Sequence, residues 1–321
     1  MELGKMQTNA QPNLLGIGTT WPSRKELIKE LRGFSPADTD RITNYNSRLD
    51  IKNRANVVEH SRYSLISNRK EAAAMSLALE GNAWLPTLAY STAYRLFADK
   101  MSFFWHYNFR LIFPGHPQPL QLFNDERATV GMAYAFILGW LDEAVYQGYL
   151  AHAALNRKYQ LVLPYEEEHR RGHAFMLRLF ANWRGDISHQ WPSYGYDEPI
   201  YEGLLENWRN PDPEVITPWL IAACDRHTHQ AGRTTSKTFY DFSDPALART
   251  PIEILMVLRL RETVGLQNPA IDHPLLEAPF DRLPEPQPKF EPDELMKGTL
   301  TRAREDWPEI DNVLSLESIK R

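Results

Sequence analysis

One segment of the chain has the residue types and the spacing of a metal site. Glu166, His169 and His173 are separated by three and four residues, so on a helix all three would lie on one face. Helical bundles that hold two metal ions use a Glu-x-x-His motif on each of two helices. A second Glu-x-x-His is absent from the chain, and so is the His-Glu-x-x-His order of zinc proteases. We therefore keep a metal-dependent helical enzyme as an alternative, and expect no metal and no other cofactor.

The single cysteine belongs to a second pair that could do chemistry. Cys224 and His227 are three residues apart, so on a helix a thiolate and an imidazole could meet. The sequence around them, WLIAACDRHTHQ, is apolar before the cysteine, and a free cysteine in such a stretch is usually a small core residue. We expect Cys224 in the core and predict no catalytic residue. A single cysteine also excludes an internal disulfide and a cysteine-based zinc site.

The strongest candidate for a binding surface is residues 185–214, called the acidic-aromatic segment below. Its seven acids and one base give a net charge of −6, against −5 for the whole chain. Tyr and Trp anchor interfaces through large rigid rings with a hydrogen-bonding tip, and carboxylates around them attract a basic partner. A solvated loop whose rings cover the core would have the same composition. The residues expected to bind a partner are Asp186, Trp191, Tyr194, Tyr196, Asp197, Glu198, Tyr201 and Glu202.

Charge is distributed unevenly over the rest of the chain. Residues 285–321 contain nine acids and six bases, a net charge of −3, so this tail and the acidic-aromatic segment together carry −9. The remaining residues therefore carry −5 minus −9, or +4. A negative fifth of the chain on a slightly positive body favours a basic partner over nucleic acid. The bases between Arg41 and Lys70 are diluted by acids and have few aromatic neighbours, which is typical of a polar helical surface.

The elements that would position these residues are helices throughout. The chain has 321 residues, 43% hydrophobic and 24% charged, which is ordinary for a globular protein with a large core. No stretch alternates apolar and polar residues as a strand does. We predict an all-α fold, either an irregular multi-helix bundle or stacked helix pairs. Helices are expected at about residues 23–33, 69–79, 86–113, 124–155, 165–183, 250–264 and 293–306, with a further start at Ser35-Pro36. Another helix is expected to start at Asp212 or at Thr217 and to run to about 231.

Three regions are expected along the chain: a flexible N-terminus at 1–22, a helical domain at 23–278, and a Pro-rich strap with a terminal helix at 279–321. The first residues lack a basic start followed by an apolar run, so we expect no signal peptide. The apolar stretch 130–150 is interrupted by Asp142 and Glu143, which favours a buried helix over a membrane span. We predict a cytoplasmic protein without a membrane partner.

Several helical segments together resemble a known group of proteins. GNAWLPTLAYSTAYRLF at 81–97, the long apolar helix after it, and PIEILMVLRLRETVGLQNPAIDHPLL at 251–276 carry the resemblance. They resemble an all-helical group of immunity proteins found beside type VI or polymorphic toxins of bacteria. The likeness covers roughly residues 70–276 and leaves the Pro-rich tail outside.

This resemblance implies a cytoplasmic antidote, not an enzyme, that binds a cognate toxin and blocks its active site. The toxin is often a nuclease, whose active site is basic. Because the resemblance transfers no individual residue, the expected interface remains the acidic-aromatic segment. A helical scaffold or adaptor without a toxin partner is a second alternative, beside the metal-dependent enzyme.

Overall fold

The computed structural model describes residues 11–35, 37–47, 60–112, 125–156, 171–188, 195–235 and 238–320. Over these ranges the regular structure is entirely helical, which confirms the predicted all-α fold. The α-helices are α1 Arg24–Leu31, α2 Asp40–Asn46, α3 His60–Leu79, α4 Leu85–Ile112, α5 Asp125–Ile137, α6 Leu141–Asn156, α7 Arg171–Arg184, α8 Pro199–Asn207, α9 Pro213–His229, α10 Ile252–Thr263, α11 Glu294–Asp306, α12 Ile310–Val313 and α13 Leu316–Lys320.

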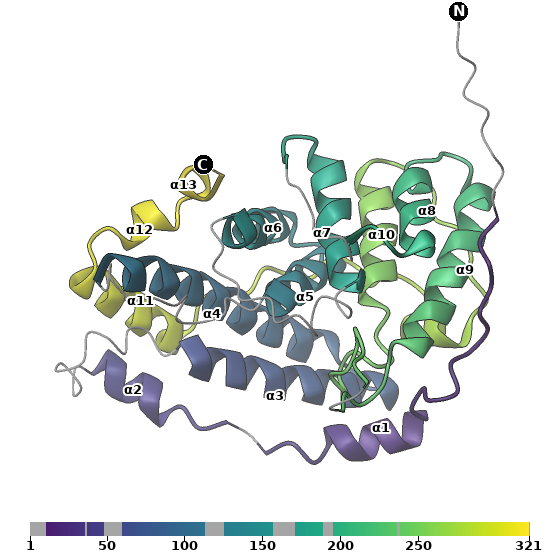
Figure 1. The fold of residues 1–321 in the computed structure, drawn as a ribbon. Coiled ribbons are helices and arrows are strands. Elements are labelled where there is room, and N and C mark those ends of the chain that lie inside the picture. The colour runs from purple at the N-terminus through teal and green to yellow at the C-terminus, as the bar shows by residue number, and fades with distance from the viewer. Residues whose placement is uncertain are drawn as a thin grey trace, which may run out of the picture.

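The long helices α3 and α4 lie side by side, with α1 and α2 below α3 in the view of Figure 1. Helices α2, α11 and α12 lie at one end of this pair, while α7, α8, α9 and α10 stand across its other end. Helices α5 and α6 pack on each other, and α5 also contacts α4 and α10. Figure 1 thus shows α5 and α6 between the α3–α4 pair and the group of α7, α8, α9 and α10, which contains the acidic-aromatic segment.

Buried side chains gather in two clusters. The larger cluster includes residues of α1, of α3 to α10 and of α13, and the acidic-aromatic segment joins it through Ile200, Tyr201 and Leu204. The smaller one joins Ile42 of α2, the start of α3, residues 94–105 of α4, and Met296 of α11. Because α3 and α4 contribute to both clusters, burial of apolar surface couples the tail helices to the rest of the molecule.

Several helix boundaries lie where the sequence places them. Ser23 and Glu26 form a reciprocal capping box at the start of α1. Asp212 caps α9 and Asp293 caps α11, each by accepting a hydrogen bond from a first-turn N–H. Gly185 directly follows α7 in the left-handed region, with a φ of 72°, where only glycine is free of strain.

The helix expected over 124–155 is wrong as a single element. It is two helices, α5 and α6, separated at Leu138–Trp140, where Gly139 has a φ of 75°. The other two glycines of this stretch, Gly131 and Gly148, stay helical and allow close packing. A Cβ on Gly131 would lie 3.2 Å from Arg95 Cδ, and one on Gly148 would lie 2.5 Å from the ring of Phe180. Asn124, the first residue of the expected helix, lies outside the described residues.

Other boundaries differ from expectation. The helix expected from Ser35-Pro36 begins at Asp40, and Pro36 itself lies outside the described residues. The start expected near Pro164 also lies outside them, so α7 is described from Arg171. The sequence did not predict α8, which lies inside the acidic-aromatic segment, nor the short helices α12 and α13.

Both ends of the described chain are bound to the helical body. Residues 11–22, which we expected to be flexible, run along α9, where Gly18 N donates to Thr228 Oγ1 at 2.7 Å (Figure 1). The Pro-rich strap crosses the α5–α6 turn, where Gln287 N donates to Leu138 O at 2.8 Å. After the strap, α11 docks against α2, and Met296 is buried in the smaller cluster together with residues of α4.

Candidate partner-binding groove

A groove with a volume of about 540 Å³ lies along α8 and α9. Most of its lining comes from the acidic-aromatic segment and from the first turns of α9. Its lining residues on α8 and on α9 recur at helical spacing, so each helix contributes one continuous stripe. Residues Gln11 and Pro12 of the N-terminal segment also line it. The lining from the two helices and the residues before α8 is Tyr196, Asp197, Pro199, Glu202, Gly203, Glu206, Asn207, Glu214, Val215, Pro218 and Trp219.

A glycine sets the distance between the two helices. A Cβ on Gly203 would lie 2.1 Å from the indole of Trp219, so the absence of a side chain lets that ring lie directly against α8. Glu198 caps α8 by accepting from Ile200 N at 3.4 Å, and Pro199 occupies the first turn. These local features place the stripe of α8 opposite the stripe of α9.

Four carboxylates line the groove, and they fall into two classes. Asp197 is held by Arg171, whose Nε lies 2.7 Å from its carboxylate, and Glu202 is held by Arg178 at 2.8 Å. Glu206 and Glu214 are exposed and form no ion pair within the described residues. Among the described residues, the unneutralised charges of the groove are therefore Glu206 and Glu214, which we did not select from the sequence.

Aromatic and apolar groups accompany these charges. Tyr196 is 47% exposed, and the guanidinium of Arg178 lies 4.4 Å from its ring centre. Val215 is 38% exposed, on the first turn of α9, and Trp219 is half-buried one turn later. Exposed large apolar groups beside carboxylates are typical of a protein interface, because the rings contribute area and the charges select the partner.

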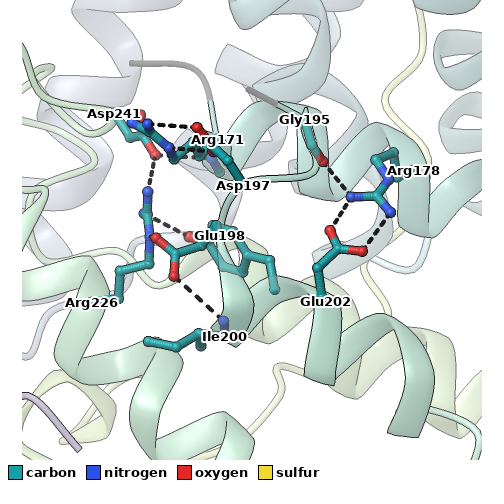
Figure 2. Close-up of polar contacts among 11 residues, drawn as sticks. Arg171, Arg178, Gly195, Asp197, Glu198, Ile200, Glu202, Arg226 and Asp241 are labelled. Carbon is teal, nitrogen blue, oxygen red and sulfur yellow. Dashed lines mark hydrogen bonds and ion pairs between the residues drawn. The ribbon is translucent and has the colours of Figure 1, made fainter. Parts of the chain in front are cut away.

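The arginines behind the groove form a polar network that fixes the segment to the core (Figure 2). Arg226, which is buried, binds Glu198 at 2.6 Å and Asp241 at 3.0 Å. Asp241 in turn accepts from the N–H of Gly172 at the start of α7, at 2.9 Å. Figure 2 shows Arg171 with Asp197 and Arg178 with Glu202 on either side of this buried centre. The network makes the backbone before α8 a fixed platform.

Several residues expected at the interface are used inside the molecule. Tyr201 is 1% exposed and stacks on Phe175, with ring centres 4.4 Å apart, and burial raises the pKa of its hydroxyl. Glu198 is an inner partner of Arg226 and not a partner-facing acid. We correct the assignment of Tyr201, which is buried and unavailable to a partner, while Glu198 stays 21% exposed with its charge already paired with Arg226. An aromatic or acidic residue type does not distinguish a helix face that points inward from one that points outward.

The remaining expected residues lie elsewhere. Asp186 accepts a hydrogen bond from Tyr149 at 2.6 Å and pairs with Lys320 at 3.5 Å, so it joins α6 and α13 outside the groove. The Tyr149 hydrogen bond lowers the pKa of the Asp186 carboxyl. Trp191 and Tyr194 lie outside the described residues. Of the eight residues, the structure brings Tyr196, Asp197 and Glu202 together at the groove.

The pair that could have formed a nucleophile is not assembled. Cys224 is buried, and burial raises the pKa of its thiol, as the core interpretation predicts. His227 faces Glu253, whose carboxylate lies 2.9 Å from Nδ1, and its Nε2 lies 3.1 Å from Leu247 O. Both imidazole nitrogens are therefore engaged by groups other than the thiol.

The candidate metal motif falls mostly outside the described residues, since only His173 lies within them. His173 is buried on α7, with its ring centre 6.2 Å from that of Phe242. In the part of the chain that the structure describes, no three acidic, histidine or cysteine side chains gather as a metal site would require. No helix in the described ranges has the length and apolar character needed to cross a membrane.

Comparison with known proteins adds no relative. No protein-family model, curated protein or solved structure matches the chain. The resemblance to immunity proteins therefore stays a prediction.

A helical pattern could have revealed the missed groove residues. Pro199, Glu202, Gly203 and Glu206 occupy positions i, i+3, i+4 and i+7, which is one face of a helix. Recognising α8 from Glu198 followed by Pro199 would have placed Glu202 and Glu206 together. The pairing of Glu202 with Arg178 depends on tertiary contacts and has no local signal.

Proposed function

We propose that this protein binds a basic segment of a partner protein in the groove between α8 and α9, and that the partner is a toxin which it neutralises. The observation that carries the proposal is the pair of unneutralised carboxylates, Glu206 and Glu214, on facing helices beside exposed Tyr196 and Val215. The binding proposal rests on this geometry, while the toxin rests on the resemblance of residues 70–276.

The groove combines steering and anchoring. Glu206 and Glu214 attract a cationic segment over a distance of about 8–10 Å at physiological salt, which accelerates association. At contact, the rings of Tyr196 and Trp219 and the Val215 side chain exclude water around those charges. A lysine or arginine of the partner that reaches both carboxylates would be held by charge-assisted hydrogen bonds.

The platform is already ordered before binding. Arg171, Arg178 and Arg226 hold the backbone at 195–202 through ion pairs, and Gly203 keeps α8 against α9. A preformed surface loses little conformational entropy on association, so more of the contact energy is expressed as affinity. Nuclease active sites attract phosphate with basic residues. A carboxylate-lined groove is therefore suited to bind the basic residues of such a site.

The first experiment identifies the partner. Wild-type protein with a C-terminal tag, chosen because Gln11 and Pro12 line the groove, is used to capture proteins from a lysate of its native host. We expect one basic protein at near-equal stoichiometry. The matched baits are the double variant Glu206→Lys/Glu214→Lys, which should lose it, and Asp281→Lys/Glu285→Lys, which changes two exposed strap acids and should retain it.

The second experiment separates a toxin from any other basic partner. The captured protein is expressed in a host that lacks both genes, alone and together with each of the three forms. Growth arrest relieved by the wild type and the strap variant, but not by the groove variant, is the expected result. A partner that is harmless when expressed alone would contradict the toxin and leave a basic protein ligand. Equal capture by the groove variant would contradict the groove.

A further inference from the structure

Exposed apolar side chains gather beside the groove. Of the nine large apolar side chains that are exposed among the described residues, five lie in the groove or on the N-terminal segment next to it: Tyr196, Val215, Leu14, Leu15 and Ile17. A single exposed apolar residue needs no explanation, but a contiguous group marks an interaction surface. Leu14, Leu15 and Ile17 are 61%, 51% and 43% exposed, and we call these three residues the apolar ledge.

The apolar ledge continues the groove along α9. Pro12 lines the groove at the start of this helix, and Gly18 is bound to Thr228 at its end, so the ledge lies between these two points (Figure 1). From Glu214 to Thr228 the helix rises about 21 Å, at 1.5 Å per residue. About six extended residues of a partner cover that length, so one short segment can reach both the groove acids and the ledge.

The N-terminal segment is held through its backbone, which leaves the side chains of the ledge exposed. Gly16 N donates to Asp225 Oδ2 at 2.8 Å, and Nε2 of His229 lies 3.1 Å from Gly16 O. Gly18 N donates to Thr228 Oγ1 at 2.7 Å. A Cβ on Gly18 would lie 2.5 Å from Thr228 O, so this close approach requires a glycine.

Asp225 connects this anchor to the core. Its carboxylate is buried, and the oxygen that does not bind Gly16 lies 3.2 Å from His273 Nε2. A buried carboxylate is costly unless its oxygens are hydrogen-bonded, so the N–H of Gly16 stabilises a charge that the core contains. After the ledge, Trp21 Nε1 donates to Ala248 O at 2.7 Å. Polar groups of the body thus fix both the middle and the end of a segment whose apolar side chains face solvent.

Charge determines which partner suits this surface. Residues 11–22 contain no charged side chain, and the groove lining contains acids but no lysine or arginine. Two copies of the chain paired through this face would each present the same acidic patch, because a twofold interface uses one surface twice. Glu206 and Glu214 would then meet no cation. A different protein, basic at one end of its binding segment and aliphatic at the other, complements the groove and the ledge together.

We propose that the groove and the apolar ledge bind one continuous segment of the partner. A lysine or arginine of that segment lies at Glu206 and Glu214, and two or more aliphatic side chains pack on Leu14, Leu15 and Ile17. The basic end of the segment rests on the proposed function, while the aliphatic end and the direction along α9 are added here. The carboxylates steer association, and the aliphatic contacts exclude water and slow dissociation.

Panning of a random dodecapeptide phage library on the full-length protein tests both ends of the segment without the natural partner. Enriched peptides should combine a lysine or arginine with at least two aliphatic residues, within about six positions and always on the same side of it. Enriched basic peptides without aliphatic residues would overturn the ledge and leave the groove. Absence of enriched basic peptides would contradict the groove, and the ledge with it.

Variants locate the aliphatic end of the segment. Leu14→Ser/Leu15→Ser removes apolar area and leaves the charge unchanged, so a synthetic peptide of the enriched sequence should bind it at least tenfold more weakly. The loss should come from faster dissociation, with the salt dependence of the wild type. Leu141→Ser/Leu316→Ser changes two exposed leucines on α6 and α13 and is the matched control, which should bind as the wild type does. Thermal unfolding checks that both variants are folded.

Equal peptide binding by the wild type and the folded ledge variant would overturn the proposal. Sedimentation of both proteins tests a second copy of the chain as the occupant. We expect monomers in each case. A wild-type dimer that dissociates in Leu14→Ser/Leu15→Ser would assign the ledge to self-association and would also overturn the proposal.

Discussion

Glu198 combines two structural tasks in one side chain. One oxygen accepts from the N–H of Ile200 and caps α8, while the other lies 2.6 Å from Nε of buried Arg226. Asp197, its neighbour in the chain, pairs with Arg171, and the Asp197 side chain is 47% exposed. Two adjacent acids with equal formal charge therefore differ in how strongly the fold depends on them.

Charge reversal should separate these two roles. Glu198→Lys places a cation beside Arg226 and removes a helix cap, so the free energy of unfolding should fall by about 3 kcal/mol. Asp197→Lys should cost less than about 1 kcal/mol, because its pair is exposed and screened. Urea denaturation followed by circular dichroism measures both. Equal and small losses would contradict the buried network in Figure 2.

Asp99 is the residue that should give the protein a pH dependence. It lies buried on α4, accepts from Gln147 Nε2 at 2.6 Å, and desolvation raises its pKa from 3.8 to about 7, against the opposing charges of Arg95 and Arg127. A folded state that holds this proton more tightly loses stability as the pH rises from about 4 through 7.

The variant Asp99→Asn keeps the shape of the side chain but has no carboxyl group that can titrate. Relative to the wild type, it should become more stable between pH 4 and pH 8, by at most about 4 kcal/mol for this pKa difference. Thermal or urea unfolding at several pH values measures the difference. A gap between the two proteins that stays constant across this range would show that the Asp99 carboxyl is not protonated in the fold.

Residue types alone predicted only part of the candidate site. Seven acids and one base in residues 185–214 give a local charge of −6, yet four of the acids pair with bases: Asp186, Asp197, Glu198 and Glu202. Their partners, Lys320, Arg171, Arg226 and Arg178, lie between 24 and 134 residues away in the chain. Pairing at such separations depends on the tertiary fold, so the sequence overstated the free charge.

Among the elements, helices with a local start and stop signal were predicted well. Ser23 with Glu26, Asp212 and Asp293 are caps whose hydrogen bonds involve residues within three positions, so their signal is contained in the sequence. The break between α5 and α6 was missed because Gly139 resembles the helical glycines Gly131 and Gly148 in its neighbourhood. What distinguishes it is the strap, whose Pro286 lies against it from far along the chain.

Two glycine-to-alanine variants test this contact between elements. Gly139 and Gly81 both have a φ of 75°, so alanine strains the backbone equally at both sites. A Cβ on Gly81 meets open space, while one on Gly139 would lie 2.7 Å from Pro286 Cβ. Gly81→Ala should cost about 1 kcal/mol and Gly139→Ala about 2 kcal/mol or more.

Proteolysis adds a readout for the strap itself. Displacement of Pro286 should expose the strap, so Gly139→Ala should be cut there faster than Gly81→Ala under native conditions. Equal stability and equal cleavage of the two variants would contradict the docking of the strap on the α5–α6 turn.

At the scale of the whole molecule, the ends of the chain complete a continuous body. The N-terminal segment lies along α9 and reaches the groove at Gln11, while α11 closes the second core cluster against α2, α3 and α4. Tyr63 on α3 and Thr299 on α11 share a hydrogen bond of 2.7 Å inside this cluster. The groove and the tail helices thus belong to one continuous framework.

The measurement that tests the central claim most directly is the binding of the captured partner to three purified forms. Wild type, Glu206→Lys/Glu214→Lys and Asp281→Lys/Glu285→Lys are compared by surface plasmon resonance at low and physiological salt. The two double variants change the net charge equally, so long-range effects of total charge cancel. Thermal unfolding of each form checks that the fold is retained.

If the groove binds a basic segment, the groove variant should bind roughly 30-fold more weakly, as expected for two reversed charges worth about 1 kcal/mol each. It should also associate more slowly and respond less to salt, while the strap variant matches the wild type. Equal dissociation constants for all three folded forms would contradict the groove between α8 and α9 as the binding site.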